Sequence, residues 1–497
     1  MATSSLAAVG GPRTLLSRLA RTDVLVLGGI VALGAWLRFR HLGMQSYWFD
    51  ESVTVRILDQ PLGAMIDAIP RSESTPPLYY VLGWVWTRIF GVSEAGLRSL
   101  SAVAGVATLP LVWAAGRRLV HRTAGLVAAG LCAVNPTLVW YSQEARSYAL
   151  MACLGALSFL LFVRAWQQPG GLRLAVWALA CAAALTTHYF SAFLILPEAA
   201  ALLWRWRRSQ RGPVICAVAA IGAVGAALLP LARHQEASGR TAWIAASDLG
   251  DRIRAAGQEL LSAGTHSITT GTQPRSLWSI PAAVLLVGAL ALLLRQGDQG
   301  ERSGAGLAAL VGAGTILVPL ALVLTPIDFF QDRNLLAAWI PLSVAIGAAF
   351  AVRRAAPLGL LAAAALGAIG LWVDHRVVGE PGLQRADWRG LAHAIGPPSR
   401  ARALLVSPGF NVAPLAVYGH PTTPVAPGAR VQEIDVVGQL SAGTPPVGPG
   451  GFGLAQRVAR RELTLLRYRG SGPLTLTQPA LAQLGPLVLD SGTPAAR

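Results

Sequence analysis

Residues 22–39, TDVLVLGGIVALGAWLRF, form an apolar run that follows the basic residues Arg13, Arg18 and Arg21. About 20 residues of this kind cross the roughly 30 Å hydrocarbon core of a bilayer. Similar runs recur through the first three quarters of the 497-residue chain, which is 53% hydrophobic and has a mean hydropathy of +0.50. The sequence therefore predicts an α-helical polytopic membrane protein. No A-x-A cleavage site follows the first run, so we expect it to remain as the first span.

The net charge of +17 arises from 41 basic residues, all of them Arg. They cluster in short loops between apolar runs, which is typical of the cytoplasmic turns of a membrane protein and not of a nucleic-acid-binding face. The four cysteines lie inside apolar runs, without the spacing of a zinc site or a disulfide framework. We therefore expect membrane lipids, and no nucleic acid, as partners.

Placing the Arg-rich turns in the cytoplasm predicts eleven spans in the cytoplasmic (inner) membrane, with the N-terminus inside and the C-terminus outside. The predicted spans are residues 22–39, 97–116, 123–140, 148–164, 173–187, 190–204, 213–232, 279–294, 305–324, 335–352 and 356–373. The aromatic-rich residues 77–90 are interpreted as an interfacial helix, because a span there would leave a basic cluster, Arg117, Arg118 and Arg122, outside. External loops are expected at residues 41–76 and 233–277, the latter with Trp243 and Trp278 at its margins.

The pattern changes after residue 373, where apolar stretches become short and Pro and Gly interrupt them. Residues 403–406 and 463–466 resemble strands, and residues 388–395 resemble a helix. The sequence thus predicts a transmembrane domain, 1–373, and a small extracytoplasmic α/β domain, 374–497. The tail from Pro473 onward is expected to be poorly ordered.

Polar and ionisable residues gather at the predicted external ends of the spans, while the predicted cytoplasmic ends carry only Arg. The external groups are Asp50-Glu51, the segment Tyr141–Tyr148, Thr187–Phe190, Asp328–Asn334 and Asp387–Arg389. Ionisable residues at membrane depth are costly, and they usually face a water-filled cavity and one another. These groups therefore predict a shared external cavity.

Each motif also has a simpler interpretation. Glu144 and Arg146 would form an ordinary solvated ion pair, and His188 with Tyr189 would be an interfacial anchor. Arg333 would mark the end of a loop, and the acidic pair of the first loop would be solvated. Taken together, the groups suit group transfer from a lipid phosphate. A carboxylate beside an acceptor hydroxyl is a general base, and burial beside a second acid raises its proton affinity. Arginine offers a bidentate fork for the departing phosphate.

The motifs occur in a fixed order: Trp48–Glu51, Thr75–Tyr80, Gly91–Arg98, Tyr141–Tyr148 and Thr187–Tyr189. This order resembles the multi-span glycosyltransferases of the C type (GT-C). More narrowly, it resembles the bacterial family 39-like mannosyltransferases and the lipopolysaccharide core galacturonosyltransferases. Protein O-mannosyltransferases and lipid A aminoarabinose transferases are more distant relatives. The resemblance covers about residues 20–350, and the motif order over the first 190 residues is its specific part.

The resemblance implies inverting transfer of a single sugar from a polyprenyl-phosphate-linked donor to a glycan, lipid or protein acceptor. Asp50 matches the catalytic carboxylate, with Glu51 its neighbour. The implied substrate-binding residues are Tyr79, Gln143, Glu144, Arg146, Tyr148, His188, Tyr189 and Arg333. Relatives often carry a basic residue or His before the Pro-Pro motif; Thr75 stands there in this chain, so that contact is absent or supplied by Arg71. Some C-type enzymes use a divalent metal and others do not, so the resemblance leaves a divalent cation open, with Asp50 and Glu144 as its oxygen ligands.

Two alternatives remain beside the enzyme. A polytopic transporter or a flippase of lipid-linked sugars would concentrate polar residues near the bilayer midplane and often carries internal repeats. A non-catalytic assembly protein would use the C-terminal domain for docking and would leave the acidic pair unexplained. Mannose, arabinose and galacturonic acid are all carried on polyprenyl phosphates, so the resemblance leaves the sugar and the acceptor open.

Overall fold

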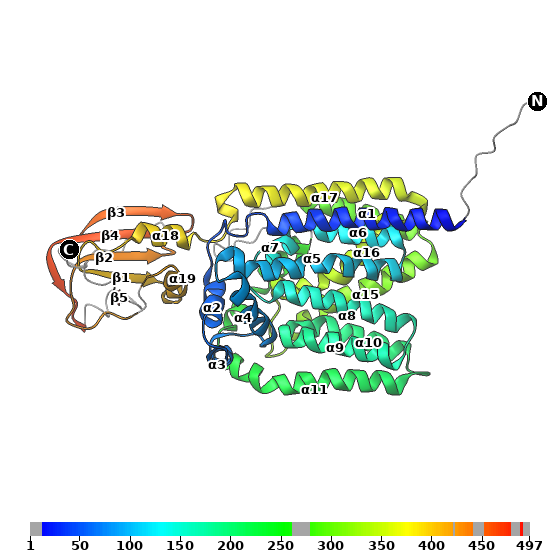
Figure 1. Cartoon of the computed structure of the whole chain (residues 1–497), viewed down its shortest axis with the longest axis horizontal. Helices are drawn as coiled ribbons and strands as arrows, with labels where there is room; N and C mark the ends of the chain where they lie inside the picture. The colour runs from blue at the N-terminus through cyan, green and yellow to red at the C-terminus, as the bar shows by residue number, and fades with distance from the viewer. Residues whose placement is uncertain (1–11, 261–278, 421–422, 441–451, 479–487, 491–497) are drawn as a thin grey trace, which may run out of the picture.

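The computed structural model of the chain describes residues 12–260, 279–420, 423–440, 452–478 and 488–490. It is an elongated bundle of helices with a small α/β domain at one end (Figure 1). Part of the predicted external loop 233–277, together with Trp278, lies outside the described residues, as does much of the predicted C-terminal tail.

The helices of the bundle follow one another with short connections. They are α1 (Pro12–Phe39), α2 (Phe49–Leu58), α3 (Leu62–Ser72), α4 (Leu78–Phe90), α5 (Glu94–Leu119), α6 (Arg122–Ala133), α7 (Pro136–Ser142), α8 (Tyr148–Gln167), α9 (Gly171–Thr187), η1 (Tyr189–Ser191), α10 (Ala192–Arg205), α11 (Arg211–Glu236), α12 (Ala242–Ala246), α13 (Leu249–Leu260), α14 (Ser279–Gln296), α15 (Gln299–Leu322), η2 (Asp332–Ala338), α16 (Trp339–Phe350), η3 (Arg353–Ala355) and α17 (Ala356–Gly379).

Every predicted span corresponds to helical structure, and the polytopic helical fold is confirmed. Eight described helices are long and apolar enough to cross a bilayer, and the bent pair α6–α7 would make a ninth. Helices α9, with 17 residues, and α10, with 14, are shorter, so the total of eleven spans stays a prediction. Many apolar side chains face outward, among them Leu25 (75% exposed), Leu172 (79%) and Leu324 (91%). Such a surface suits contact with lipid, because hydrocarbon chains solvate it as water cannot.

The span predicted at residues 123–140 is interrupted in the structure, where α6 and α7 meet at an angle of 59°. Pro136 lacks the N–H that a continuous helix needs, and the side chain of Asn135 instead accepts a hydrogen bond from the Leu138 N–H at 2.9 Å. The freed carbonyl groups of Cys132 and Ala133 accept hydrogen bonds from the buried guanidinium of Arg38, at 3.0 and 2.9 Å. Arg38 of α1 thus supplies hydrogen-bond donors to the carbonyl groups that the break between α6 and α7 leaves unpaired.

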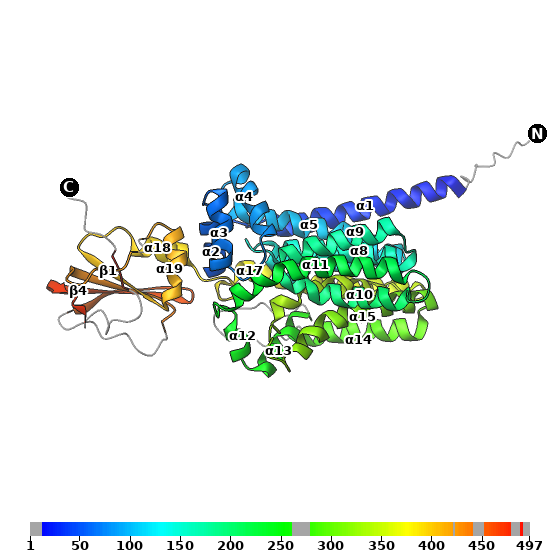
Figure 2. The same ribbon diagram turned by 90° about the horizontal axis from the view of Figure 1, so that it is seen from below.

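The predicted external loop 41–76 is largely helical, because it contains α2 and α3. The prediction of a loop missed these helices because they are short. Their apolar residues, such as Met65 and Ile69, pack in a small core with Tyr79 and Tyr80. Helix α4 coincides with the predicted interfacial helix. Figures 1 and 2 show α2, α3 and α4 gathered at the end of the bundle that faces the C-terminal domain.

The main core of the bundle lies around α5, α6, α8, α9 and α16, and Trp177 is its largest fully buried side chain. Helices α5 and α6 approach so closely that a Cβ atom on Gly116 would lie 2.8 Å from the Cα atom of Gly125. Only glycine allows this distance, and close backbone approach is a common device of membrane helices.

The C-terminal domain begins after Gly379, because α17 extends beyond the predicted boundary at residue 374. Its elements are η4 (Pro381–Leu383), α18 (Trp388–Ile395), β1 (Arg402–Ser407), η5 (Gly409–Asn411), α19 (Val412–Val417), β2 (Arg430–Gly438), β3 (Phe452–Arg460), β4 (Leu463–Thr475) and β5 (Val488–Asp490). The strand order is β3-β4-β2-β1-β5; β1 and β2 pair in parallel, and the other described pairs are antiparallel. The helix predicted at 388–395 and the strands predicted around 403–406 and 463–466 are confirmed. The tail prediction was partly wrong, since β4 continues to Thr475 and β5 pairs with β1.

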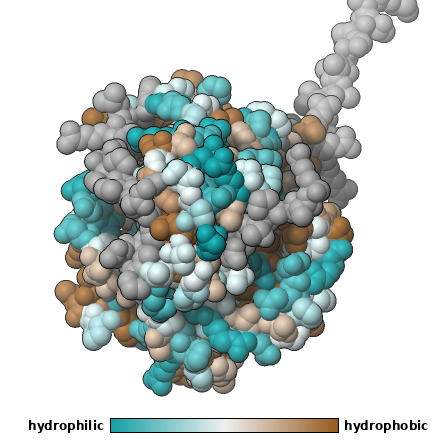
Figure 3. Space-filling model, turned by 90° about the vertical axis from the view of Figure 1, so that its left-hand side faces the viewer, coloured by the Kyte–Doolittle hydropathy of each residue, from teal (hydrophilic) through white to brown (hydrophobic). Residues whose placement is uncertain are grey.

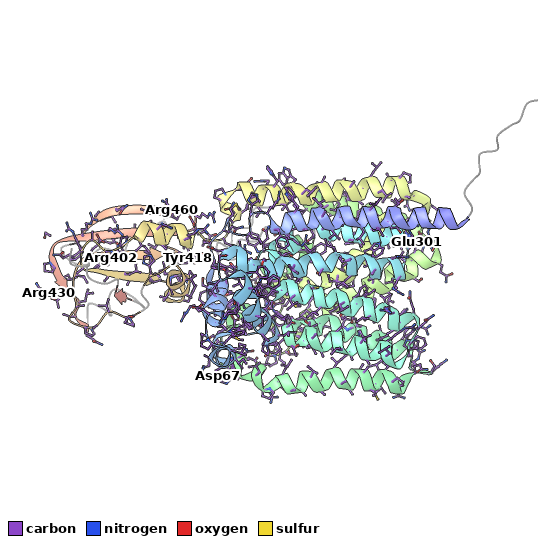
Figure 4. All side chains as sticks on the ribbon, viewed as in Figure 1. Asp67, Glu301, Arg402, Tyr418, Arg430 and Arg460 are labelled. Atoms are coloured by element: carbon purple, nitrogen blue, oxygen red, sulfur yellow. The ribbon has the colours of Figure 1, made fainter. Side chains whose placement is uncertain are left out.

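The end of the bundle opposite the C-terminal domain carries acids as well as Arg, so the prediction of Arg-only turns there was wrong. Glu301, labelled at that end in Figure 4, lies 3.2 Å from His121 and accepts a hydrogen bond from the Arg353 N–H at 3.1 Å. Arg353 also pairs with Asp298 at 3.1 Å. Asp298 and Glu301 thus link neighbouring turns by ion pairs and hydrogen bonds. The turns at this end still carry more basic than acidic residues.

Candidate active site

The predicted external groups come together at the end of the bundle nearest the C-terminal domain. Asp50 lies on α2, Arg146 precedes α8, His188 follows α9 and Arg333 lies on η2, and the contacts described below join them. Figure 2 shows α2 at this end of the bundle, and Figure 3 shows that end of the molecule, where hydrophilic and hydrophobic residues are mixed on the surface. The groups therefore share one side of the bundle, as the sequence predicted. They do not lie at the middle of the spans, where the transporter alternative would place them.

Asp50 and Arg333 form the centre of this group. The carboxylate of Asp50 lies 3.7 Å from Nη1 of Arg333, and the two side chains are 22% and 15% exposed. Within the described residues, neither side chain makes a hydrogen bond to another protein group, and Arg333 rests on the ring of Trp243 with 5.2 Å to its centroid. Both charged groups are thus held in place by their backbones and remain free to bind a ligand.

Glu51, next to Asp50, has a different environment. It is fully buried and accepts hydrogen bonds from Arg98 at 2.7 and 2.6 Å, from the Ala145 N–H at 2.8 Å and from the Trp48 N–H at 3.4 Å. Burial has the largest effect and raises the pKa of Glu51, but the charge and hydrogen bonds of Arg98, the charge of Arg385 and the Ala145 N–H together outweigh it and lower the pKa of this carboxyl below 4.5. Both oxygens are occupied, so Glu51 is not the free second acid that the sequence suggested beside Asp50.

Arg146 links α2, the end of α3 and α4 by hydrogen bonds. Its Nη1 donates to Glu73 at 2.7 Å, to Thr54 at 3.1 Å and to the Tyr80 hydroxyl at 3.3 Å. The same nitrogen lies 3.5 Å from the carbonyl oxygen of Asp50. The Nε atom of Arg146 is buried without a partner in the described structure. Arg146 is therefore not paired with Glu144, as the simple ion-pair interpretation would have it.

His188 lies in an aromatic group with Tyr148, Tyr141 and Phe190. Its ring centroid is 5.2 Å from that of Tyr148, which is 5.0 Å from that of Tyr141. Burial, aided by the charges of Arg146 and Arg333, lowers the pKa of His188 to about 3. The Nδ1 atom accepts a hydrogen bond from the Phe190 N–H at 3.3 Å. His188 is therefore neutral, and its Nε2 carries the proton.

Glu144 is paired with a residue from the far end of the sequence. Nη2 of Arg385 donates to its Oε2 at 3.0 Å, and the guanidinium of Arg385 lies 4.0 Å from the ring centroid of Trp140. The Oε1 atom of Glu144 is buried without a partner among the described residues. Burial raises the pKa of Glu144, Arg385 opposes the shift, and the negative charges of Glu51 and Asp50 add to it.

Three of the predicted substrate-binding residues have polar groups that are hydrogen-bonded within the protein or buried. The side-chain amide of Gln143 donates to the carbonyls of Leu37 and Arg40, at 2.8 and 3.0 Å, and so closes the C-terminal end of α1. The hydroxyl of Tyr189 donates to Gln235 at 2.9 Å. Tyr79 is fully buried and packs edge-to-face on Tyr80, with 5.7 Å between ring centroids.

Three residues that matter in this geometry were not among the predicted site residues. Arg98 is the last residue of the motif Gly91–Arg98, but the sequence assigned it no role. Glu73 lies just before the Pro-Pro motif, where Thr75 instead bonds to the Tyr80 hydroxyl at 3.2 Å, and the predicted substitute Arg71 is exposed. Arg385 gave no local signal, because its partner is 241 positions away.

A cavity of about 40 Å³ with a mixed polar and apolar lining adjoins the site, between the ends of α1, α7, α13 and α17. Its polar and aromatic lining includes Arg40, His41, Trp140, Tyr141, Glu259 and Asp374. This volume accommodates a few water molecules, so a sugar would enter only after side chains move.

The divalent cation that the sequence leaves open would need several oxygen ligands grouped around one point. Within the described residues there is no group of three or more His, Cys, Asp or Glu side chains that could hold a metal. Asp50 and Glu144, the predicted ligands, each face an arginine. Calcium and magnesium need several oxygen ligands around one point, and these two carboxylates do not supply them.

Comparison with known proteins agrees with the resemblance read from the motifs. The sequence model of the family described as dolichyl-phosphate-mannose-protein mannosyltransferase matches residues 74–229. No curated protein sequence matches the chain significantly. The structure of ArnT from Cupriavidus metallidurans in the apo state is similar, with a TM-score of 0.57 and 12% identity over 90% of this chain and 98% of ArnT.

Two further structures are similar. ArnT from the same organism bound to undecaprenyl phosphate has a TM-score of 0.53 and 12% identity over 89% of this chain and 98% of ArnT. An oligosaccharyltransferase from Archaeoglobus fulgidus in complex with Zn and sulfate has a TM-score of 0.44 and 13% identity over 74% of this chain. The chain spans only 55% of the length of that enzyme, so the assignment of the fold rests on ArnT. The chain is a multi-span membrane protein with the GT-C glycosyltransferase fold, and its residues 74–229 match the dolichyl-phosphate-mannose-protein mannosyltransferase family.

Proposed function

We propose that the chain transfers one sugar, a hexose or a pentose, from a polyprenyl-phosphate-linked donor to a hydroxyl group of an envelope glycan, lipid or protein. The reaction takes place at the extracytoplasmic face of the cytoplasmic membrane. The observation that carries the proposal is the pair Asp50 and Arg333. A carboxylate and a guanidinium lie 3.7 Å apart without hydrogen bonds to other described side chains, at the end of a bundle with a lipid-compatible surface.

In the proposed reaction, Asp50 accepts the proton of the acceptor hydroxyl while that oxygen forms a bond to the anomeric carbon of the donor sugar. The bond between the anomeric carbon and the phosphate oxygen breaks, and its electron pair leaves with the polyprenyl phosphate. A single displacement of this kind inverts the anomeric configuration. A positioned general base typically accelerates such a step about 10²- to 10⁴-fold.

Arg333 is assigned to the phosphate of the donor. Within the described residues, its guanidinium pairs with Asp50, rests on Trp243 and makes no hydrogen bond, so its N–H groups remain available for two phosphate oxygens. The fixed positive charge stabilises the phosphate as negative charge grows on it, and costs no reorganisation at that moment. Arg146, whose Nη1 is occupied by Glu73, Thr54 and Tyr80, is assigned to positioning α2.

His188 and Tyr148 are assigned to the donor sugar. Neutral His188 offers its Nε2–H as a donor to a sugar hydroxyl, because Nδ1 already accepts a hydrogen bond from Phe190. Tyr148, whose ring lies beside it at a tilt of 39°, supplies an aromatic surface. Glu51 is assigned to positioning, because four N–H groups occupy its carboxylate.

The test uses the chain in nanodiscs with a panel of labelled polyprenyl-phosphate sugars and an envelope fraction of the source organism as acceptor. Wild type should move label from the lipid to the acceptor. Asp50→Asn, which keeps the size of the side chain, should lower transfer at least about 100-fold. Asp67→Asn is the matched control, because Asp67 is an exposed acid on the neighbouring helix α3. Full transfer by Asp50→Asn, at normal expression, would disprove the assigned role.

A further inference from the structure

The linker between α17 and α18 bonds directly to the segment that leads into α2. The side chain of Gln45 accepts a hydrogen bond from the Arg385 N–H at 2.8 Å. The hydroxyl of Ser46 donates to the Ala386 carbonyl at 2.9 Å and accepts from the Trp388 N–H at 3.0 Å. Gln45 and Ser46 are buried, so water does not compete for these bonds. The path of the chain toward Asp50 is therefore partly set by the C-terminal domain.

A second set of contacts joins the folded part of the domain to the same segment. The hydroxyl of Tyr418, labelled at the junction in Figure 4, donates to Glu94 at 2.8 Å and accepts from the Tyr47 N–H at 2.7 Å. Arg389 of α18 pairs with Glu94 at 2.9 Å and donates to the Met44 carbonyl at 2.9 Å. The carboxylate of Glu94, at the start of α5, thus binds both Tyr418 and Arg389 of the C-terminal domain.

An aromatic contact reaches the first residue of α2. The ring of Phe49 meets that of Phe410 edge-on, with 5.3 Å between centroids and 74° between planes. Phe49 directly precedes Asp50, so this contact acts on the backbone that carries the proposed base. Edge-to-face aromatic pairs fix relative orientation as well as distance.

The side chain of Arg385 enters the site itself. It is 6% exposed, pairs with Glu144 at 3.0 Å and covers Trp140. Its carbonyl oxygen accepts a hydrogen bond from Arg461, at the turn between β3 and β4, at 2.6 Å. Because Arg385 is the sole hydrogen-bond partner of the Glu144 side chain within the described residues, it determines how that carboxylate is turned.

We propose that the C-terminal domain is a positioning element of the active site: Arg385 acts through Glu144, and the contacts to residues 44–49 act through α2 on Asp50. The inference rests on the proposed function and gives the domain a task within it. Reacting groups must be held within a fraction of an ångström, and a misplacement of about 1 Å costs about 100-fold in rate. A domain used only for docking acceptors would not need a side chain buried against Glu144.

The test compares Arg385→Met and Arg385→Lys with Arg469→Met. Arg469 is the matched control, because it loses an ion pair to Glu433 at 2.9 Å within the sheet and touches neither Glu144 nor residues 44–49. Two quantities are measured: kcat and donor KM in the transfer assay, and amide hydrogen exchange of residues 45–58 in nanodiscs. We expect Arg385→Met to lower kcat about 10- to 100-fold, to leave donor KM within about twofold and to speed exchange at 45–58. Arg385→Lys should recover part of kcat.

The outcomes separate the two proposals. If the wild type transfers no sugar from any donor, the proposed function fails, while the exchange measurement still tests the link between the domain and α2. Wild-type kcat and exchange in Arg385→Met would overturn the positioning role. Equal losses in Arg469→Met would also overturn it, because the effect would then come from unfolding of the domain. A change in acceptor KM alone would favour a docking domain.

Discussion

Arg98 and Glu51 form a buried ion pair in which every N–H of the guanidinium has an acceptor. Two hydrogens bond to the carboxylate at 2.7 and 2.6 Å, and the others bond to the carbonyls of Leu42, Gln45 and Ser46. One side chain of α5 thereby shapes the whole turn before α2. The neighbour of the proposed base is thus part of the structure that holds it.

Replacing Glu51 by Gln should destabilise the protein strongly. The variant keeps the shape of the side chain but leaves Arg98 buried without its counter-charge, and breaking such a pair costs about 3–5 kcal/mol. The free energy of unfolding in mixed micelles is the measurement. Asp67→Asn, which removes an exposed acid, should change it by less than about 0.5 kcal/mol. Equal stability of the two variants would contradict the assigned role of the pair.

The same pair predicts a loss of stability in acid. Burial raises the pKa of Glu51, but Arg98, with help from Arg385 and the Ala145 N–H, outweighs it and lowers the pKa below 4.5 in the folded protein. The unfolded chain therefore takes up this proton first as the pH falls. The contribution is fully present above about pH 4.5 and is lost as the pH falls through the folded pKa. Unfolding measured between pH 6 and pH 3 should show this loss in the wild type, and Glu51→Gln should lack it.

His188 predicts a second acid effect, in a different pH range. Its pKa is lowered from 6.5 to about 3 in the folded protein, so the unfolded chain binds a proton below pH 6.5 that the native protein does not. Acidification should then cost about 1.4 kcal/mol per pH unit between these values. His188→Gln should flatten the dependence of stability on pH between 6.5 and 4.5. An unchanged slope would mean that the ring is protonated in the native protein.

Arg333 predicts the strength of donor binding. Arg333→Met should lower transfer about 10²- to 10³-fold, because it removes the charge that faces the leaving phosphate. It should also weaken inhibition by added polyprenyl phosphate. Arg333→Lys should recover only part, since an ammonium group cannot bind two oxygens as a planar fork does. Arg254→Met is the control, because Arg254 is 67% exposed and pairs with the exposed Asp251, three residues before it on α13. Equal inhibition of wild type and Arg333→Met would exclude phosphate contact by Arg333.

Cysteine labelling tests the predicted sidedness. In a background with Cys216, the exposed native cysteine, replaced by Ser, Asp67→Cys and Arg208→Cys carry labels at opposite ends of the bundle. A membrane-impermeant maleimide added to whole cells should label residue 67 and not residue 208. Lysis should expose residue 208. Labelling of both from outside would contradict the topology.

The sequence predicted the fold well wherever hydropathy decides it. Long apolar runs gave the helices of the bundle, and the order of motifs gave the GT-C fold. Two features depend on tertiary contacts and were missed. The break at Pro136 needs Arg38 from another helix to satisfy Cys132 and Ala133, and hydropathy averages over such a break. Helix α3 is short, and packing of Met65 and Ile69 stabilises it more than its own propensity does.

The candidate site was predicted in outline. Asp50, Arg146, His188 and Arg333 do lie together, because charges at membrane depth must find a common polar space. The partners of these groups were not predictable from spacing. The acid next to Asp50 in the sequence turns to Arg98, while the acid that pairs with Arg146 is Glu73. A helix separates neighbouring side chains by about 100°, so adjacency along α2 sends Asp50 and Glu51 to different surroundings.

The contact of residues 385–389 with residues 43–46 also has a consequence for biosynthesis. A ribosome completes the first extramembrane segment long before it reaches the codon for Arg385. Until the last quarter of the polypeptide has been synthesised, Gln45, Ser46 and Glu144 lack the partners described above. A nascent or truncated chain that ends before residue 385 therefore inserts its helices without forming these contacts. Their formation is tied to completion of translation.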